Sequence, residues 1–465
     1  MLATLYDIFA ICYHYTMNNK SLHQKLEEYC RSGYLPMHMP GGKRRTGILA
    51  GLDITEIDGF DNLHDPRGII GDLENDIAAL WHADEAFISV NGSTAMIESA
   101  ICASMRYCPD GKVLAASNCH LSVWHGIEMA GCMHKVVDPS CGSAPFAMEV
   151  KPEDIERVLK EDTSVKAVVI TSPTYEGIIS DTREIYDITR RYGCALIIDE
   201  AHGAHLGLDD YWGQEACGDI VIKSLHKTLS APTQTAVMLK YSGRIDSGDI
   251  RHYIDIFESS SPSYLLMSGV SEAVTLLHQR DALSEWEQAV SEAETKLKQL
   301  KNIRLFTATG KDRSKIVLVC RGRQLADILR TKYKIETEAS FDTHLIAMTG
   351  IGDTRESLAR FTSALTEIDR EHPELAGDEG FCFTPPVHLP QKSLAQAARH
   401  RILTVGIEDA EGKISGGFIY DYPPGIPVIM PGELLSRSVV ERLSQKGIRD
   451  VSVLDLEVEG NTSVL

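Results

Sequence analysis

Apolar runs of strand length alternate with helix-like segments between residues 85 and 240, and this alternation limits the fold more than any other feature. Intervening segments such as "EDIERVLKE" (153–161) carry apolar residues at helical spacing. The pattern predicts an α/β protein with a large, mostly parallel sheet covered by helices. The runs are "EAFISV" (85–90), "KVLAAS" (112–117), "VKAVVIT" (165–171), "CALIIDE" (194–200), "DIVIKS" (219–224) and "AVMLK" (236–240).

The chain has 465 residues, which is more than one hydrophobic core usually holds, so we expect several units. A charged, helix-patterned stretch follows the alternating region, and further α/β patterning follows that stretch. We therefore predict an N-terminal segment (1–60), a large domain (61–265), a long connecting helix (266–300) and a smaller C-terminal α/β domain (301–465).

The composition narrows the class of partner and the compartment. The formal net charge of −20 disfavours nucleic acid and anionic membranes, and it favours a small cationic substrate. The 11 cysteines form no CxxC pair and no cluster with zinc spacing, so we expect no metal site and a cytoplasmic protein. No apolar run is long enough to cross a bilayer, and residues 1–16 lack the pattern of a signal peptide.

Polar residues follow the predicted strands, where parallel α/β sheets bind their ligands. After 85–90 come Gly92, Ser93 and Thr94 at the start of a helical pattern. Free backbone N–H groups, the helix dipole and two hydroxyl groups at that place suit a phosphate, although the same residues also suit an ordinary helix cap.

Asp199 ends a predicted buried strand, where a carboxylate is costly unless a cation or a strong donor faces it. It begins the sequence Asp-Glu-Ala-His (199–202), which also occurs in helicases. Those enzymes need a GxxxxGK[ST] phosphate loop, and this chain has no Gly-Lys-Ser or Gly-Lys-Thr. We therefore expect Asp199 to face a cation or a strong hydrogen-bond donor.

Lys227 lies 28 residues after Asp199, just past the next predicted strand. Partial burial lowers the pKa of a lysine and makes its neutral, nucleophilic form accessible. A phosphate site, a buried carboxylate and such a lysine together predict pyridoxal 5'-phosphate, with Lys227 forming an imine and Asp199 facing the ring nitrogen. Around the phosphate we expect Ser93, Thr94, Ser224 and His226. On the two faces of the ring we expect His120 and Ala201.

The chain resembles the prokaryotic ornithine/lysine/arginine decarboxylases, which are fold type I pyridoxal-phosphate enzymes. The most particular matches are "SSSPSYLLM" (259–267) and "YPPGIPVIMPGE" (422–433). Further matches are "PMHMPGGK" (36–43), "DITEIDGFDNLHDPRGI" (53–69), "VNGST" (90–94), "SNCHLSVWHG" (117–126), "TSPTYEG" (171–177), "DEAHGAH" (199–205) and "SLHKTL" (224–229).

The resemblance implies α-decarboxylation of arginine, lysine or ornithine. It makes Lys227 the Schiff-base lysine and Asp199 the partner of the ring nitrogen, and it implies that His202 lies near the ring hydroxyl. It also implies a homodimer in which each site is shared between subunits. For the distal cation of the substrate, the matching motifs offer Glu433 and Asp65.

Two alternatives stay open at this stage, and both concern the same cofactor fold. An aminotransferase-like reaction would need an arginine for the substrate carboxylate, and Arg321, Arg323 and Arg360 lie in the predicted C-terminal domain. A non-catalytic regulator or binding module is suggested by departures from the family pattern at Gly42 and Leu121. "LHDPRG" (63–68) and Pro232 are further departures.

Overall fold

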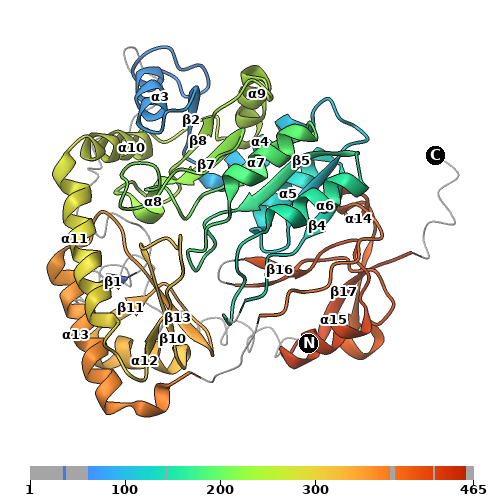
Figure 1. The fold of residues 1–465 in the computed structure, drawn as a ribbon. Helices are drawn as coiled ribbons and strands as arrows, with labels where there is room; N and C mark the ends of the chain where they lie inside the picture. The colour runs from blue at the N-terminus through green and yellow to red at the C-terminus, as the bar shows by residue number, and fades with distance from the viewer. Residues whose placement is uncertain (1–34, 38–60, 143, 378–382, 423–424, 457–465) are drawn as a thin grey trace, which may run out of the picture.

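The computed structural model describes residues 35–37, 61–142, 144–377, 383–422 and 425–456, and its architecture is α/β (Figure 1). A seven-stranded sheet in the order β2-β8-β7-β6-β5-β3-β4 forms the centre. Strands β4, β3, β5, β6 and β7 are parallel neighbours, and β8 runs antiparallel to β7 and β2. The mostly parallel sheet predicted from the sequence is therefore confirmed. Its strands are β2 (Glu85–Ser89), β3 (Lys112–Ala116), β4 (Met133–Val137), β5 (Val165–Thr171), β6 (Ala195–Asp199), β7 (Ile220–Ser224) and β8 (Ala236–Lys240).

Helices cover this sheet, and their burial follows their sequence. Helix α4 (Gly92–Met105) is apolar on nearly all sides, and it packs between the sheet and helices α5 (Leu121–Ala130) and α9 (Ser247–Phe257). Helices α6 (Pro152–Glu161) and α7 (Thr182–Arg191) are amphipathic, because only their apolar stripes are buried. Helix α3 (Ile69–Leu80) packs against β2.

The stretch predicted as one connecting helix is two helices in the structure. Helix α10 (Tyr264–Leu277) ends at His278, and α11 (Arg280–Leu297) begins after Gln279. Helix α11 packs against α13 (Arg355–Glu371), along one side of the molecule (Figure 1). The two helices thus lead from the large sheet to the next unit.

Two further units follow in the chain, and we call them the small unit (301–376) and the C-terminal unit (383–456). The small unit has an antiparallel sheet in the order β12-β13-β10-β9, and β11 pairs in parallel with β1 (Leu35–Met37). Its core is continuous with that of the large sheet. Its elements are β9 (Arg304–Leu305), β10 (Lys315–Val319), α12 (Gly322–Tyr333), β11 (Ile335–Thr337), β12 (Ala339–Ser340), β13 (His344–Met348), α13 and η2 (Pro373–Leu375).

The C-terminal unit contains two antiparallel strand pairs, β14 with β17 and β15 with β16. A hydrophobic cluster of its own includes Ile429, Leu435 and Leu443, while Leu394 and Met430 belong to the core of the large sheet. Its elements are α14 (Leu394–Ala397), β14 (Ile402–Gly406), η3 (Ile407–Asp409), β15 (Ile419–Asp421), β16 (Ile426–Ile429), α15 (Arg437–Gln445) and β17 (Asp450–Leu454).

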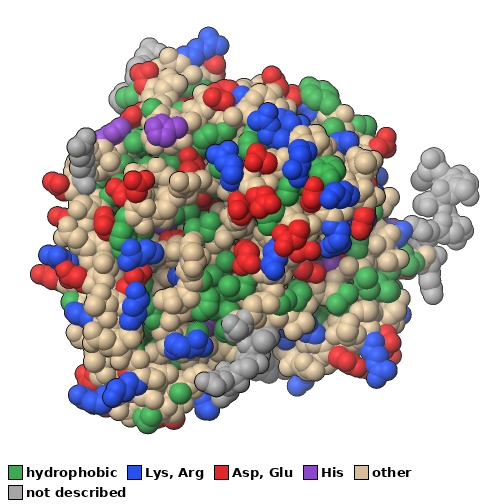
Figure 2. All heavy atoms as spheres, in the orientation of Figure 1, with side chains coloured by type: hydrophobic (Ala, Val, Ile, Leu, Met, Phe, Trp, Pro, Cys, Tyr) green, Lys and Arg blue, Asp and Glu red, His purple; other side chains and the backbone are tan. Residues whose placement is uncertain are grey.

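Charged side chains of both signs are interspersed on the face shown in Figure 2. The excess of acidic residues is therefore not gathered into one patch on that face. Among the described residues, the helices are all too short or too polar to cross a lipid bilayer.

Candidate active site

The carboxyl ends of the central strands open into one cavity of about 560 Å³. Ser117 and Asn118 follow β3, Thr171 ends β5, Asp199 ends β6 and Ser224 ends β7, and all five line the cavity. Strands β5, β6 and β7 run parallel and in register, with Thr171 beside Asp199 and Asp199 beside Ile222. The fold therefore brings the polar residues that follow separate strands to one place.

All the residues that the sequence predicted for the cofactor and the catalytic step line this cavity. They come from the first turn of α4, the start of α5, the loop after β6, and the short helix α8 (Leu225–Thr228) that follows β7. The residues are Ser93, Thr94, His120, Asp199, Ala201, His202, Ser224, His226 and Lys227. The structure thus brings them together, while their individual roles stay predictions.

Lys227 carries an amine that is easier to deprotonate than that of an ordinary lysine. Burial lowers its pKa to about 8, with the positive charge of Lys315 acting in the same direction and with Asp199 and Glu338 opposing them. At pH 7 about one molecule in ten then has a neutral amine at this position, against fewer than about one in a thousand for an unperturbed lysine. The site therefore supplies an amine nucleophile near neutral pH.

We expect this pKa to be visible in protein freed of cofactor. The rate at which an amine-acylating reagent modifies Lys227 should rise about tenfold per pH unit and level off above pH 8, because only the neutral amine reacts. Peptide mass spectrometry would follow the modification, and Lys227→Ala would identify the peptide. A midpoint near that of ordinary lysines, about 10.4, would contradict the burial of this amine.

His202 lies against the Lys227 amine. Its Nε2 is 2.8 Å from Nζ of Lys227, and the ring of Tyr175 meets the imidazole edge to face at 5.1 Å. Burial, followed by the charges of Lys227 and Lys315, lowers the pKa of His202 well below its ordinary value. The imidazole is therefore neutral and accepts an N–H of the ammonium at Nε2, while its buried Nδ1 has no partner among the described residues.

Asp199 is a buried carboxylate whose charge acts on Lys227 without a direct ion pair between them. Asp199 is only 3% exposed, and its Oδ1 accepts the backbone N–H of Ala201 at 3.1 Å. Within the described ranges it forms no ion pair with a Lys, Arg or His side chain, judged by N···O distances up to 4.0 Å. A buried carboxylate in this position is stabilised when a cationic group enters the cavity beside it.

The first turn of α4 and the turn after β7 face the cavity with donor groups. Gly92 has a φ of +79°, and its N–H donates to the carbonyl of Gln234, which fixes the entry of the chain into α4. The hydroxyl group of Ser224 is buried without a partner in the described chain. Nδ1 of His226 lies 3.1 Å from the carbonyl of Thr235, and burial lowers the pKa of this histidine to about 4. These groups form a polar pocket that suits a small anion.

His120 caps α5 at the mouth of the cavity. Its Nδ1 accepts the backbone N–H of Ser122, and the backbone N–H of Leu121 donates to the carbonyl of Gly425. Gly425 has a φ of +109°, and a Cβ built there would lie 3.2 Å from Cδ2 of His120. Because Leu121 contributes its backbone to this contact, its departure from the family pattern leaves the contact in place.

Family models match most of the described chain. The model for the Orn/Lys/Arg decarboxylase major domain matches residues 48–327, and that for the Orn/Lys/Arg decarboxylase C-terminal domain matches residues 379–446. The chain belongs to the Orn/Lys/Arg decarboxylase family. This assignment confirms the resemblance seen in the sequence.

Two curated relatives of this decarboxylase-family protein match along nine-tenths or more of their length. The uncharacterized protein YaaO of Bacillus subtilis (strain 168) is 28% identical over 480 residues, which cover 96% of this chain and 97% of that protein. An arginine decarboxylase of Bacillus anthracis is 26% identical over 455 residues, which cover 90% of each chain.

Solved structures establish the fold of this family member as fold type I. Lysine decarboxylase A from Pseudomonas aeruginosa superposes with a TM-score of 0.71 at 16% identity, covering 86% of this chain and 73% of that chain. A ureidoglycine–glyoxylate aminotransferase from Bacillus subtilis superposes with a TM-score of 0.54 at 16% identity, covering 75% of this chain and 95% of that chain. These likenesses concern the fold alone.

The residues of the cavity fit pyridoxal phosphate on the criterion of unpaired polar atoms. Five buried atoms without a hydrogen-bond partner in the described part belong to cavity residues; besides the four named below, Nε2 of His344 is one of them, and the buried carboxylate of Asp199 is a further polar group. Unpaired buried polar atoms are rare in folded proteins unless a ligand meets them. The four atoms are Oδ1 of Asn118, Oγ1 of Thr171, Nδ1 of His202 and Oγ of Ser224.

Two residues suggested for the distal cation lie elsewhere. Glu433 is 0% exposed, pairs with Nδ1 of His388 at 3.0 Å and accepts the backbone N–H of Met430, so it is committed inside the C-terminal unit. Asp65 forms an exposed ion pair with Arg67. Neither lines the cavity, because both carboxylates point to partners in their own surroundings.

The three arginines that an aminotransferase-like reaction could use also lie outside the cavity lining. Arg323 pairs with Asp342 at 2.9 Å, and Arg360 donates to the carbonyl of Tyr333. Gly42 falls outside the described residues. Leu121, the other departure, lies at the start of α5 and is half-buried.

Sequence reasoning missed part of the cavity wall. Tyr175 and Glu176 follow β5 within the motif "TSPTYEG", so the rule that placed Asp199 could have found them. Glu338 and Phe341 come from the small unit, where short strands and polar neighbours give no comparable signal. The small unit thus contributes acidic and aromatic groups to the site.

Proposed function

We propose that this protein binds pyridoxal 5'-phosphate and catalyses α-decarboxylation of a basic amino acid, giving the corresponding amine and carbon dioxide. The observation that carries the proposal is that the amine of Lys227, with a pKa of about 8, and the buried carboxylate of Asp199 line the same cavity. The membership of the chain in the Orn/Lys/Arg decarboxylase family supports the reaction class.

When bound, pyridoxal phosphate supplies an aldehyde that captures amines and a ring that accepts the electron pair left by departing carbon dioxide. In this chain Asp199 would hold the proton on the ring nitrogen. Ser93, Thr94, Ser224 and His226 would hold the phosphate at the first turn of α4.

Lys227 would tether the aldehyde and later deliver a proton to Cα of the substrate. The neutral His202, whose Nε2 lies 2.8 Å from Nζ, would orient this amine by accepting one of its N–H groups. His120 would pack over one ring face and Ala201 over the other.

The experiment is a spectrum of the purified protein with added pyridoxal phosphate, followed by product analysis with arginine, lysine and ornithine. We expect the imine absorbance, and carbon dioxide without a keto acid for at least one substrate. Formation of a keto acid would indicate the aminotransferase-like reaction. An imine without turnover of any basic amino acid would indicate a non-catalytic binding module.

We further propose that Glu338 binds the distal ammonium or guanidinium group of the substrate. It lines the cavity together with the rings of Phe146, Tyr175 and Phe341, and its Oε1 accepts the hydroxyl of Tyr175 at 2.8 Å. A carboxylate among aromatic faces suits an organic cation.

Two other carboxylates on the cavity wall suit this role less well. Burial raises the pKa of Glu176 to about 7, so a large part of it is protonated near neutral pH. Asp421 is engaged by Nζ of Lys446 at 2.6 Å.

Glu338→Gln should raise KM for the favoured basic amino acid by about ten- to a hundredfold, the value of a hydrogen bond to a charged group. The amide can still accept the Tyr175 hydroxyl, so the wall of the cavity should stay in place. Steady-state carbon dioxide release measures KM, and Asp421→Asn is the matched control, for which we expect a change of at most about twofold.

Norleucine, which lacks the distal cation, separates cation recognition from a general loss of binding. Its inhibition constant should be the same for Glu338→Gln as for the unaltered protein. Equal weakening of norleucine and of the basic substrate would refute the role of Glu338.

The resemblance also leads us to propose a homodimer with shared sites. Tyr422 lines the cavity while 80% exposed, which suits a residue at a surface that a second subunit covers. Light scattering of the purified protein would give the mass, and a monomer that is fully active would contradict the shared site.

A further inference from the structure

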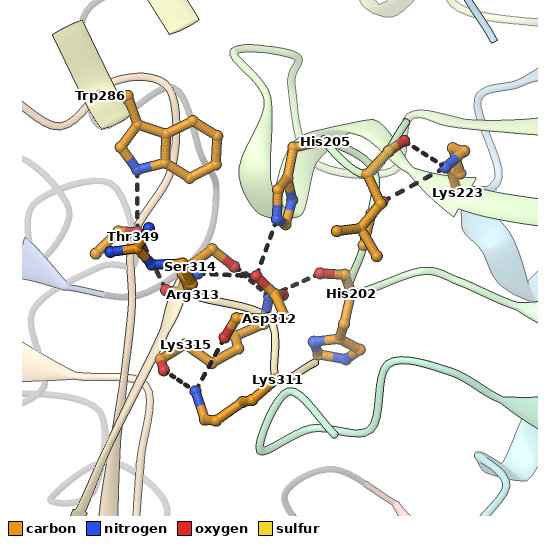
Figure 3. Close-up of polar contacts among 12 residues, drawn as sticks. His202, His205, Lys223, Trp286, Lys311, Asp312, Arg313, Ser314, Lys315 and Thr349 are labelled. Atoms are coloured by element: carbon orange, nitrogen blue, oxygen red, sulfur yellow. Dashed lines mark hydrogen bonds and ion pairs between the residues drawn. The ribbon is translucent and has the colours of Figure 1, made fainter. Parts of the chain in front are cut away.

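A buried ion network joins the small unit to the loop that follows β6. Lys315, at the start of β10, is 1% exposed, and its ammonium group donates to three oxygens. These are Oδ2 of Asp312 at 2.8 Å, Oγ of Ser314 at 2.8 Å and the main-chain carbonyl of His202 at 2.7 Å (Figure 3). All three N–H donors of the ammonium are thus used, and one of them holds the backbone of a cavity residue.

Asp312 completes the network on the side away from the cavity. Its carboxylate also accepts Nε2–H of His205 at 3.0 Å and the N–H of Ser314 at 2.8 Å (Figure 3). Burial raises the pKa of this carboxyl, but Lys315 and His205 outweigh burial and hold it well below its ordinary value. The carboxyl group of Asp312 is therefore ionised inside the protein, where an ion pair with full hydrogen bonding holds its geometry firmly.

The loop after β5 is shaped to fit this pair. Gly177 has a φ of +89°, and its carbonyl accepts the N–H of Asp312 at 2.8 Å. A Cβ at Gly177 would lie 2.9 Å from Cγ of Lys315 and 3.1 Å from the carbonyl oxygen of Asp312. A side chain at this position would therefore push the Lys315 stem away from His202.

A second buried lysine holds the same loop from the large sheet. Lys223 of β7, which is labelled in Figure 3, donates to the carbonyls of Gly203 at 3.5 Å and Leu206 at 3.2 Å. It does not reach His202. Among the described lysines, it is therefore Lys315 of the small unit that bonds to the backbone of His202.

We propose that Lys315 is a positioning residue of the active site: its hydrogen bond to the His202 carbonyl fixes the loop so that the His202 imidazole stays against the Lys227 amine. The ion pair with Asp312 holds Lys315 in place for this task. In this way the small unit, which contributes no imine-forming group, sets the geometry of the amine. The inference rests on the proposed role of Lys227.

The test is the double variant Asp312→Asn/Lys315→Met, which removes one positive and one negative charge, keeps the size of the Asp312 side chain and shortens the Lys315 side chain only by its terminal nitrogen. In protein freed of cofactor, the rate at which Lys227 captures the aldehyde of added pyridoxal phosphate is measured by borohydride trapping and peptide mass spectrometry. We expect a fall of about tenfold or more, and a similar fall in kcat with KM within about twofold, as for other groups that orient a reactive residue through a second contact.

Lys311→Met is the matched control. Lys311 is a lysine of the same small-unit loop, and it donates to the carbonyls of Asp312 and Lys315 rather than to the loop after β6. Capture and kcat should fall less than in the double variant, because Lys311→Met leaves the hydrogen bond between the Lys315 ammonium and the His202 carbonyl in place. If capture and kcat fell as far in this control as in the double variant, the cause would be a general loosening of the contact between the small unit and the large sheet, and the proposal would be overturned.

Unchanged capture and kcat in a folded double variant would also overturn it. If the double variant fails to fold, Gly177→Ala tests the same contact with both charges present, and it should reduce capture and kcat in the same way while unchanged values would refute the inference. If the unaltered protein captures no pyridoxal phosphate at Lys227, the proposed function itself is wrong. If the unaltered protein and the variant capture it equally well, only the role of Lys315 is wrong.

Discussion

Lys227→Ala should lower kcat for the favoured basic amino acid by more than about 10³-fold, because one side chain serves two steps. It would both tether the aldehyde and carry the proton to Cα, and the described cavity lining contains no other lysine. Its pKa of about 8 makes both tasks possible near neutral pH. Carbon dioxide release measures the loss, and the imine absorbance should vanish with it.

The control for this variant separates chemistry from folding. Alanine removes a partly buried amine that meets His202, so the thermal midpoint should change little or rise when the desolvated charge is gone. Lys227→Arg keeps the charge but forms no imine, and it should be as inactive as the alanine variant. Retention of the imine absorbance by either variant would show that the cofactor is bound elsewhere.

Asp199→Asn should reduce kcat by about 10²–10³-fold, since it removes a preorganised charge from the place where the ring nitrogen would carry a proton. The amide keeps the size of the carboxylate and can still accept the N–H of Ala201, so folding should be preserved. Carbon dioxide release at saturating pyridoxal phosphate measures kcat, and a titration with the cofactor measures its affinity.

Asp421→Asn serves again as the control, because it neutralises another carboxylate on the same cavity wall. That variant should keep its kcat. If Asp199→Asn kept more than about a third of the activity, the ring nitrogen would have no need of this carboxylate, and the proposed orientation of the cofactor would be wrong.

The sequence predicted the large sheet and the residues at its strand ends because buried parallel strands have a simple signal. Strand β6 is apolar throughout and ends at Asp199, so both the strand and its functional end can be read from the same few letters. Strand β4 escaped because "MHKVV" is only partly buried, with Lys135 exposed in its middle. The register in which the parallel strands pair was not predicted, because no single residue in the sequence specifies it.

The remaining part of the site depends on contacts that no local pattern reveals. Lys315 precedes an apolar run and would ordinarily be taken as the solvated start of a strand, yet it is buried by Gly177 and His202 from the large unit. Glu338 sits between two very short strands with polar neighbours. The burial of Lys315 and the position of Glu338 in the cavity wall both arise only when the small unit packs on the large sheet.

The separate core of the C-terminal unit has a consequence for how the molecule comes apart. Buried residues such as Ile429 and Leu443 form a cluster distinct from that of the large sheet. Gly425 of the same unit nevertheless lies against His120, which lines the cavity. Local unfolding of such a unit exposes backbone amides without melting the strands behind it. Amide exchange should therefore be quicker in β14–β17 and α15 than in β5 and β6, and a ligand that touches both regions should slow it.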